Sequence, residues 1–216
     1  MVEVYGLDID KLDNGLLRAN QEELTGYFSD YRRNKIVQCK NEKAKRQSIA
    51  AGYLLDLVLS LHGLREKTAE FVENPYGKRM LSGADVNLSH SGHYVLCAYA
   101  ASSVGIDIEQ MRPDMENVAK RFFAKTEYDW LLKQENRKEA FSRLWTLKES
   151  YVKQIGTGLK MPLSQFEIKI GQEICVCAVD RKRKMGPHFK EYVVEDYCIA
   201  VCAEEQEFSE EIIFLA

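Results

Sequence analysis

Two acidic side chains stand two positions apart in the stretch VGIDIEQ. Asp107 and Glu109 alternate there with Ile106 and Ile108. Because side chains two apart on a strand project from the same face, a strand here would present both carboxylates together. Neighbouring carboxylates suit a divalent cation. The simpler interpretation is a strand with two ordinary solvent-facing acids, and this stretch alone favours it.

A second group of charged residues lies in the stretch RLWTLKESYVKQIG, whose apolar residues recur at helical spacing. Glu149 and Lys153 lie one turn apart at the edge of the apolar face, an arrangement that is commonly a surface ion pair worth about 0.3–0.5 kcal/mol. Lys148 falls within that face, where an unpaired ammonium is costly. It therefore needs either a path by which its ammonium reaches solvent or an anion, a phosphate or a neighbouring carboxylate, and it counts as a candidate cofactor-binding residue.

Residues that could hold phosphate oxygens occur earlier in the chain. His90 ends the stretch VNLSH at a Ser-Gly turn and follows Ser89. A lone histidine there is usually structural, but Lys78 of the YGK turn and Arg46 of a predicted helix could join it at a phosphate. No P-loop or GxGxxG motif is present. Carboxylates with surrounding basic residues suit Mg²⁺ on a diphosphate, and displacement at one of its phosphorus atoms.

The elements that would position these residues follow from the periodicity. Residues 41–61 are expected to form a long amphipathic helix, and residues 86–109 a meander of three short strands with turns at 91–92 and 101–103. The later predicted elements are helical stretches at 121–132 and 138–156, the second closed by Gly156 and Gly158, and strands at 166–170, 174–179, 192–195 and 198–203.

A helix followed by strands thus occurs twice, before and after about residue 112, and no linker-like composition divides the chain. The pattern predicts an α+β fold of two similar α+β subdomains packed together, an N-terminal one at 1–112 and a C-terminal one at 113–216.

Composition limits the partners. The chain has 216 residues, 45% hydrophobic, and its 30 basic against 33 acidic side chains give a formal net charge of -3. This balance argues against wholesale binding to nucleic acid or to an anionic membrane. The N-terminal stretch carries acids from Glu3 onward and has no signal-peptide pattern, so we expect a cytoplasmic protein.

Five stretches, YGK, NLSHSG, GIDIE, FFAKTEY and WTLKESYVKQIGTGL, occur in that order between about residues 45 and 166. Together they resemble the surfactin-synthetase-activating type of 4'-phosphopantetheinyl transferase. The resemblance implies a Mg²⁺-dependent enzyme that transfers the phosphopantetheine arm of coenzyme A to a serine of an apo acyl or peptidyl carrier protein and releases 3',5'-ADP. It also implies a monomer whose two subdomains form an intramolecular pseudo-dimer, with coenzyme A and Mg²⁺ in the cleft.

The resemblance assigns catalytic and metal-binding roles. Asp107, Glu109 and Glu149 match the metal ligands of the family. The carrier serine needs a base, for which Glu149 is the first candidate and Glu127 of the TEY stretch the second. Lys153 is expected to neutralise charge on the diphosphate during transfer.

Other matched positions concern the substrates. Those that contact the coenzyme A phosphates in the family correspond to Ser89, His90 and Lys153, and the basic residues near its nucleotide end to Arg46 and Lys78. Further basic candidates in the stretch DYRRNKIVQCK are Arg32, Arg33 and Lys35. The carrier is expected to approach over Met111 to Phe123.

Two other classes of function stay open. A carrier-binding module that has lost catalysis would keep the fold and the docking surface. A different Mg²⁺-dependent phosphotransferase or phosphatase would act on a small diphosphate without a protein acceptor.

Overall fold

The computed structural model describes residues 1–17, 21–113, 115–178 and 186–215. The longest helix of the first half, α4 (Glu42–Leu61), begins where an Asn41 side chain accepts a hydrogen bond from the Ala44 amide. Its buried residues include Leu54 and Val58, one turn apart, which pack in the core beside it. The helix predicted for residues 41–61 is confirmed.

The remaining elements of the first half are β1 (Glu3–Asp8), η1 (Ile9–Lys11), α1 (Asn14–Leu17), α2 (Gln21–Tyr27), α3 (Asp30–Val37), β2 (Phe71–Glu73), β3 (Arg79–Leu81), β4 (Asp85–Ser91), β5 (Tyr94–Ala100) and β6 (Val104–Gln110). β5 pairs antiparallel with both β1 and β4. β11 (Ile213–Phe214) returns from the far end of the chain and adds parallel to β1, which gives a sheet of order β11-β1-β5-β4.

The second half contains α5 (Glu116–Phe122), α6 (Lys125–Leu131), α7 (Arg137–Ile155), η2 (Gly158–Lys160), η3 (Leu163–Gln165), β7 (Phe166–Ile170), β8 (Ile174–Ala178), β9 (His188–Val194) and β10 (Tyr197–Ala203). Helix α7 ends at Gly156, whose φ of 72° is the left-handed conformation that glycine adopts readily. A three-stranded sheet of order β6-β10-β9 lies beside α7, and two-stranded ribbons join β2 to β3 and β7 to β8.

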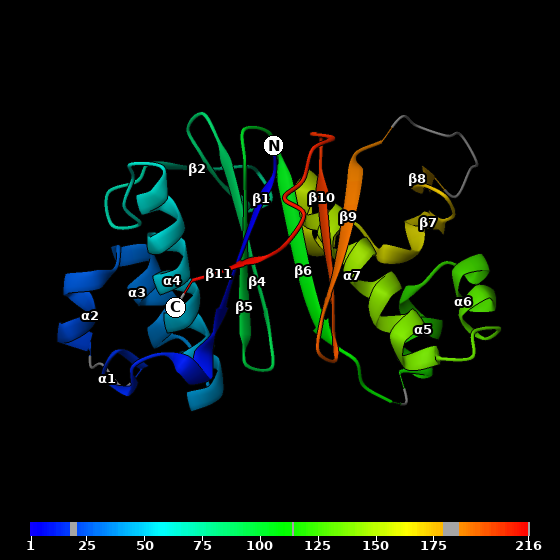
Figure 1. Cartoon of the computed structure of the whole chain (residues 1–216), viewed down its shortest axis with the longest axis horizontal. Coiled ribbons are helices and arrows are strands. Elements are labelled where there is room, and N and C mark those ends of the chain that lie inside the picture. Colours follow the sequence, from blue (N-terminus) through cyan, green and yellow to red (C-terminus); the bar gives the residue numbers. More distant parts are fainter. Residues whose placement is uncertain (18–20, 114, 179–185, 216) are drawn as a thin grey trace.

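The two larger sheets lie between two long helices, α4 on the side of the first sheet and α7 on the side of the second (Figure 1). An apolar core fills the space between the sheets, with Leu96 of β5, Ile106 of β6 and Val201 of β10 all fully buried. The layering confirms the predicted α+β class. No helix of the described residues is long and apolar enough to cross a membrane.

One predicted strand connection is wrong. The third strand of the expected meander, β6, does not continue the first sheet but pairs antiparallel with β10 along its whole length. The later strands are found, although β9 begins at His188 rather than 192, and residue 179 lies outside the described residues. The division into 1–112 and 113–216 places β6 in the first part, although it bonds with a strand of the second, and the division stays a proposal.

Candidate active site

Strand β6 is an edge strand, and side chains rather than a neighbouring strand bond its outward amides. The N–H groups of Val104, Ile106, Ile108 and Gln110 donate to the side chains of Asp85, Asn87, Ser89 and Ser91 of β4, at 2.9, 3.0, 3.4 and 3.2 Å. The two residues of each bond are the same number of positions apart in the sequence, so every second residue of β6 lies opposite every second residue of β4. We call this contact the β4–β6 seam. It satisfies amides that an edge would otherwise expose and joins the two sheets.

Asp107 lies at the centre of a polar cluster on the opposite face of β6 from the inter-sheet core. Its Oδ1 accepts hydrogen bonds from Ser89 Oγ at 2.9 Å and from Lys153 Nζ at 2.7 Å. Lys153 also donates to Ser89 Oγ at 3.0 Å and to the Ile106 carbonyl at 2.9 Å. The structure therefore brings together three predicted site residues from β4, β6 and α7.

The close approach of α7 to β6 depends on Gly105. A Cβ atom at this position would lie 2.1 Å from the Ser150 carbonyl oxygen and 2.4 Å from the Gln154 nitrogen, both in the backbone of α7. Only glycine fits there without moving the helix. This contact sets the depth at which α7 lies and hence the reach of Lys153 to Asp107.

Two further carboxylates border this cluster. Burial and then the Asp107 carboxylate raise the pKa of Glu149. Burial also raises the pKa of Glu109, where repulsion from Asp107 adds to the effect and Arg112, 3.8 Å from Oε1, opposes it. Glu149 forms no ion pair with Lys153 within the described ranges, so the surface pair that their spacing suggested is not formed. The three carboxylates carry more negative charge than Lys153, beside Asp107, and Arg112, beside Glu109, together neutralise.

The three carboxylates are neighbours without forming a closed ligand set. Among the described residues, no three His, Cys, Asp or Glu side chains are placed together to hold a metal ion. The donor chemistry nevertheless suits Mg²⁺, which prefers oxygen ligands, binds through one or two carboxylates and takes the rest from water and substrate phosphates. The carboxylate oxygens of Asp107, Glu109 and Glu149 are therefore suitable ligands for Mg²⁺.

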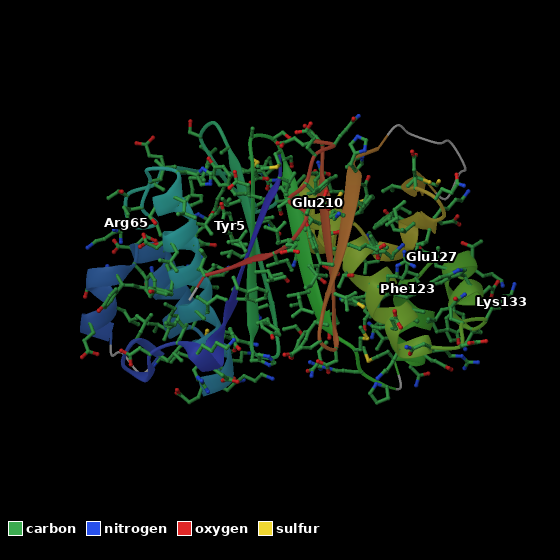
Figure 2. All side chains as sticks on the ribbon, in the orientation of Figure 1. Tyr5, Arg65, Phe123, Glu127, Lys133 and Glu210 are labelled. Carbon is green, nitrogen blue, oxygen red and sulfur yellow. The ribbon has the colours of Figure 1, made fainter. Side chains whose placement is uncertain are left out.

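Lys148, expected to bind cofactor, has a carboxylate partner inside the protein, which supplies the anion that its burial requires. It is fully buried, and its Nζ donates to both Glu127 oxygens at 2.7 and 2.8 Å and to the Phe166 carbonyl at 2.7 Å. Glu127 also accepts from the amides of Ala124 and Ile168. It lies among the helices of the second half (Figure 2). Both oxygens of Glu127, the second candidate base, accept hydrogen bonds within the protein, and its side chain is buried.

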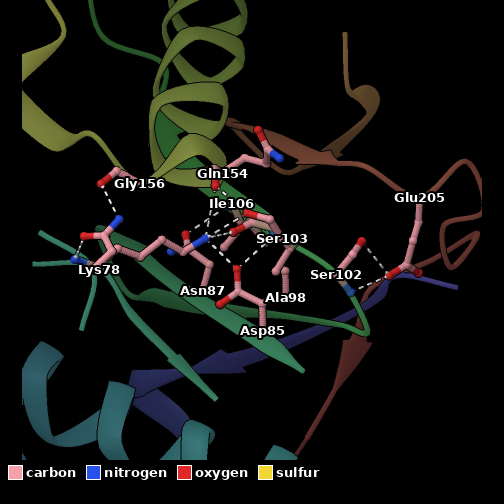
Figure 3. A network of polar contacts seen from close by, with 12 residues as sticks. Lys78, Asp85, Asn87, Ala98, Ser102, Ser103, Ile106, Gln154, Gly156 and Glu205 are labelled. Atoms are coloured by element: carbon pink, nitrogen blue, oxygen red, sulfur yellow. Dashed lines mark hydrogen bonds and ion pairs between the residues drawn. The ribbon is translucent and has the colours of Figure 1, made fainter. Parts of the chain in front are cut away.

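Lys78 connects the two halves. Its Nζ forms an ion pair with Asp85 and donates to the Val104 carbonyl at 2.9 Å and the Gln154 carbonyl at 3.2 Å, at one end of the β4–β6 seam (Figure 3). These partners occupy the donors of its ammonium, which was expected to lie near the nucleotide end of coenzyme A.

The other predicted phosphate-binding residues differ in placement. Arg46, on α4, is paired with Asp10 at 3.4 Å and does not line the cavity described next. His90 is exposed on β4. Partial loss of hydration and then the Lys153 ammonium lower the pKa of His90, which favours its neutral form.

An open cavity of about 300 Å³ lies against the Lys153 side of this cluster. Its wall is rich in cations and aromatic rings from both halves, among them Tyr31, Arg32, Lys35, Lys78, Arg79 and Lys153. Sequence reasoning missed Tyr31 and Arg79. Arg79 directly follows the YGK stretch, and a basic residue at a turn next to a phosphate-binding motif was the available signal.

Comparisons with known proteins agree with one another. The family model of the 4'-phosphopantetheinyl transferase superfamily matches residues 103–202. The chain is 32% identical to 4'-phosphopantetheinyl transferase Sfp of Bacillus subtilis, covering 100% of this chain and 98% of that protein. It is 33% identical to 4'-phosphopantetheinyl transferase HetI of Nostoc sp., over 87% of this chain and 76% of that one.

A solved structure, holo-[acyl-carrier-protein] synthase of Thermotoga maritima, aligns with a TM-score of 0.39 at 23% identity, over 46% of this chain and 61% of that chain. The full-length match to the Bacillus relative and the family model decide the assignment. The chain belongs to the 4'-phosphopantetheinyl transferase superfamily.

Proposed function

We propose that this chain transfers the 4'-phosphopantetheine group of coenzyme A to a serine of an apo acyl or peptidyl carrier protein, with Mg²⁺ as cofactor and 3',5'-ADP as the other product. Membership of the superfamily supports the reaction. The observation that supports the site is the contact of Lys153 with Asp107 and Ser89 at a wall of a basic cavity. We propose a cytoplasmic monomer without a nucleic-acid partner, in keeping with the net charge of -3.

Asp107, Glu109 and Glu149 would hold the metal. When bound, Mg²⁺ supplies positive charge that offsets the negative charge of the diphosphate and of the leaving phosphate. Lys153 donates to Asp107 Oδ1 and Ser89 Oγ, so its ammonium would lie beside both the metal and a substrate phosphate.

The protein side chains position the reacting groups. Lys153 donates to the diphosphate, and Ser89 and His90, at the adjoining end of β4, donate to its oxygens. The carrier serine Oγ attacks the β-phosphorus as its proton passes to Glu149. A new Oγ–P bond forms while the bond between that phosphorus and the bridging oxygen breaks, so the electron pair leaves with 3',5'-ADP. Glu149 borders Asp107, so its carboxylate belongs to the proposed site and can accept this proton.

The carrier would dock over the segment Met111 to Phe123, next to the end of β6. Phe122 is 37% exposed on α5 and packs edge-on against the Trp145 ring, with centroids 6.0 Å apart. An aromatic side chain that is exposed and also held in place by a neighbouring ring suits contact with an apolar helix face of a partner.

Release of 3',5'-ADP tests this function against its alternatives. The purified protein is incubated with coenzyme A and Mg²⁺, with an apo carrier, with a carrier whose acceptor serine is replaced by alanine, or with none. We expect stoichiometric 3',5'-ADP only with the intact carrier. Release without a carrier would indicate a small-molecule diphosphate enzyme, and carrier binding without release would indicate a docking module.

A further inference from the structure

Arg79 is held between two aromatic rings at the wall of the cavity. Its guanidinium carbon lies 3.7 Å from the centroid of the Tyr31 ring on α3 and 4.1 Å from that of Phe71 on β2. Stacking of this kind covers the faces of the planar group and leaves its edge N–H donors available. Arg79 forms no ion pair with a carboxylate in the part of the chain that the structure describes. A rigidly held guanidinium with free edge donors suits an anion with two acceptor oxygens.

Neighbouring cations lack complete partners as well. Lys35 lies 5.8 Å from the centroid of the same Tyr31 ring and has no carboxylate partner within the described ranges. Arg32 is only 6% exposed, and its Nε has no hydrogen-bond partner, although Glu66 lies 4.0 Å away. Burial, opposed by Glu66, lowers the pKa of Arg32, and Arg79 lowers it further. This end of the cavity thus carries positive charge that the protein does not neutralise.

The two ends of the cavity differ in the anion that they suit. Lys153 lies at the end beside the carboxylates, where the proposed metal and diphosphate would bind. Arg79, Lys35 and Arg32 line the same cavity, and its lining residues in the described part of the chain include no acid. Glu73, the cross-strand partner of Arg79, forms no ion pair with it there, and Glu66 lies 4.0 Å from Arg32. Coenzyme A carries one further phosphate besides its diphosphate, the dianionic monoester on the ribose 3' position. When the diphosphate of coenzyme A binds at Lys153, its 3'-phosphate can therefore bind to the cations at the other end of the cavity.

We propose that Arg79, clamped between Tyr31 and Phe71, is the specificity-determining residue that recognises the ribose 3'-phosphate of coenzyme A in this chain. The proposal rests on the proposed function for its ligand. Lys35 and Arg32 supply additional charge, and the two rings fix the orientation of the Arg79 guanidinium.

Calorimetric titration with coenzyme A and with dephospho-coenzyme A, which lacks only the 3'-phosphate, tests the proposal. The wild-type protein is expected to bind coenzyme A at least about tenfold more tightly. In Arg79→Gln this preference should fall by about tenfold, with the affinity for dephospho-coenzyme A changed less than about twofold. Arg79→Lys, which keeps the charge without the planar fork, should retain an intermediate preference. Arg137→Gln, an exposed arginine paired with Glu116, is the matched control and should leave both affinities unchanged.

Because the preference is a ratio within one variant, a partly unfolded sample does not alter it. Tyr31→Leu offers a second variant, expected to reduce the preference by releasing one face of the guanidinium. Equal weakening of both ligands in Arg79→Gln, or an unchanged ratio, would overturn the proposal. Carrier modification is measured on the same samples. Transfer to the carrier with an unchanged ratio of the two affinities would contradict only the role of Arg79. A ratio that depends on Arg79, without transfer to the carrier, would contradict only the proposed function.

Discussion

The ammonium of Lys153 on α7 lies 2.7 Å from Oδ1 of Asp107 on β6. A cation from one element thus already neutralises an acid on another, at the point where a metal and a diphosphate are proposed to bind. Lys153 competes with a metal for Asp107 and is also placed to hold a phosphate.

Lys153→Met separates these two effects. Transfer should fall about 100-fold or more in kcat/KM for coenzyme A, because a donor to the developing phosphate charge is lost. Mg²⁺ binding without substrate, measured by calorimetry, should tighten because Asp107 no longer has an ammonium partner. Lys125→Met, which removes an exposed partner of Asp129, should change neither quantity. Weaker Mg²⁺ binding in Lys153→Met would contradict this account.

Glu149→Gln tests the proposed base. Because the amide cannot accept the serine proton, kcat should fall about 10²- to 10⁴-fold. The acidic limb of the pH profile of kcat should disappear with it. Recovery of most of the rate at raised Mg²⁺ concentration would show that Glu149 only binds the metal.

The pKa shifts of the acidic cluster predict how stability depends on pH. The pKa of Glu109 is raised above its usual value of 4.5, so the folded state holds this proton more tightly than the unfolded state. Its stabilising contribution is complete below pH 4.5 and is lost as the pH rises through the raised pKa. Glu109→Gln should therefore raise the melting temperature at pH 7 by about 1–3 °C while abolishing most activity.

The same comparison at pH 4 should show little difference in melting temperature. Mg²⁺ should raise the melting temperature of the wild-type protein at pH 7 and not at pH 4, because protons displace it from the carboxylates. A variant less stable than wild type at pH 7 would contradict the sign of this effect.

The buried Lys148 and Glu127 pair is expected to serve stability rather than binding. Glu127→Gln leaves the Lys148 ammonium buried without a carboxylate and should cost about 3–5 kcal/mol in the free energy of unfolding, measured with urea. Adding Lys148→Met should restore part of that loss. The exposed pair of Lys125 and Asp129 is the control, with less than about 1 kcal/mol expected from its removal. A KM for coenzyme A raised tenfold in a folded Lys148→Met protein would return Lys148 to the binding site.

Gly105→Ala should separate α7 from β6. Its methyl group would meet the α7 backbone, so the free energy of unfolding should fall by about 1–3 kcal/mol and transfer should fall with it. Gly26→Ala is the matched control, since nothing lies within 4 Å of a Cβ at that position. Full activity in a stable Gly105→Ala protein would show that the depth of α7 does not position Lys153.

Local periodicity was enough to predict several parts of the site. Alternation in VGIDIEQ places Asp107 and Glu109 on one face of a strand, and helical spacing places Lys148 in a buried stripe. The pairing of β6 with β10 was not predictable in this way, because it joins segments far apart in the sequence. The alternating polar residues of β4 were a local sign of a different contact, the seam between β4 and β6.

The identity of charge partners was the least predictable feature. The spacing suggested Glu149 for Lys153, whereas the ammonium reaches Asp107 on a different element. Lys148 needed an anion, and its partner Glu127 lies on α6. Long side chains choose partners in three dimensions, so sequence alone left phosphate and carboxylate as equal possibilities.

Intact-mass spectrometry of an apo carrier protein can show whether this protein transfers phosphopantetheine and whether the transfer depends on Asp107. The carrier is incubated with coenzyme A, Mg²⁺ and either the wild-type protein or Asp107→Asn. We expect the wild-type protein to add one phosphopantetheine arm to the acceptor serine, and this addition to be lost in the variant and in the presence of a chelator. No mass gain on several acyl and peptidyl carriers, or equal gain with Asp107→Asn, would contradict it.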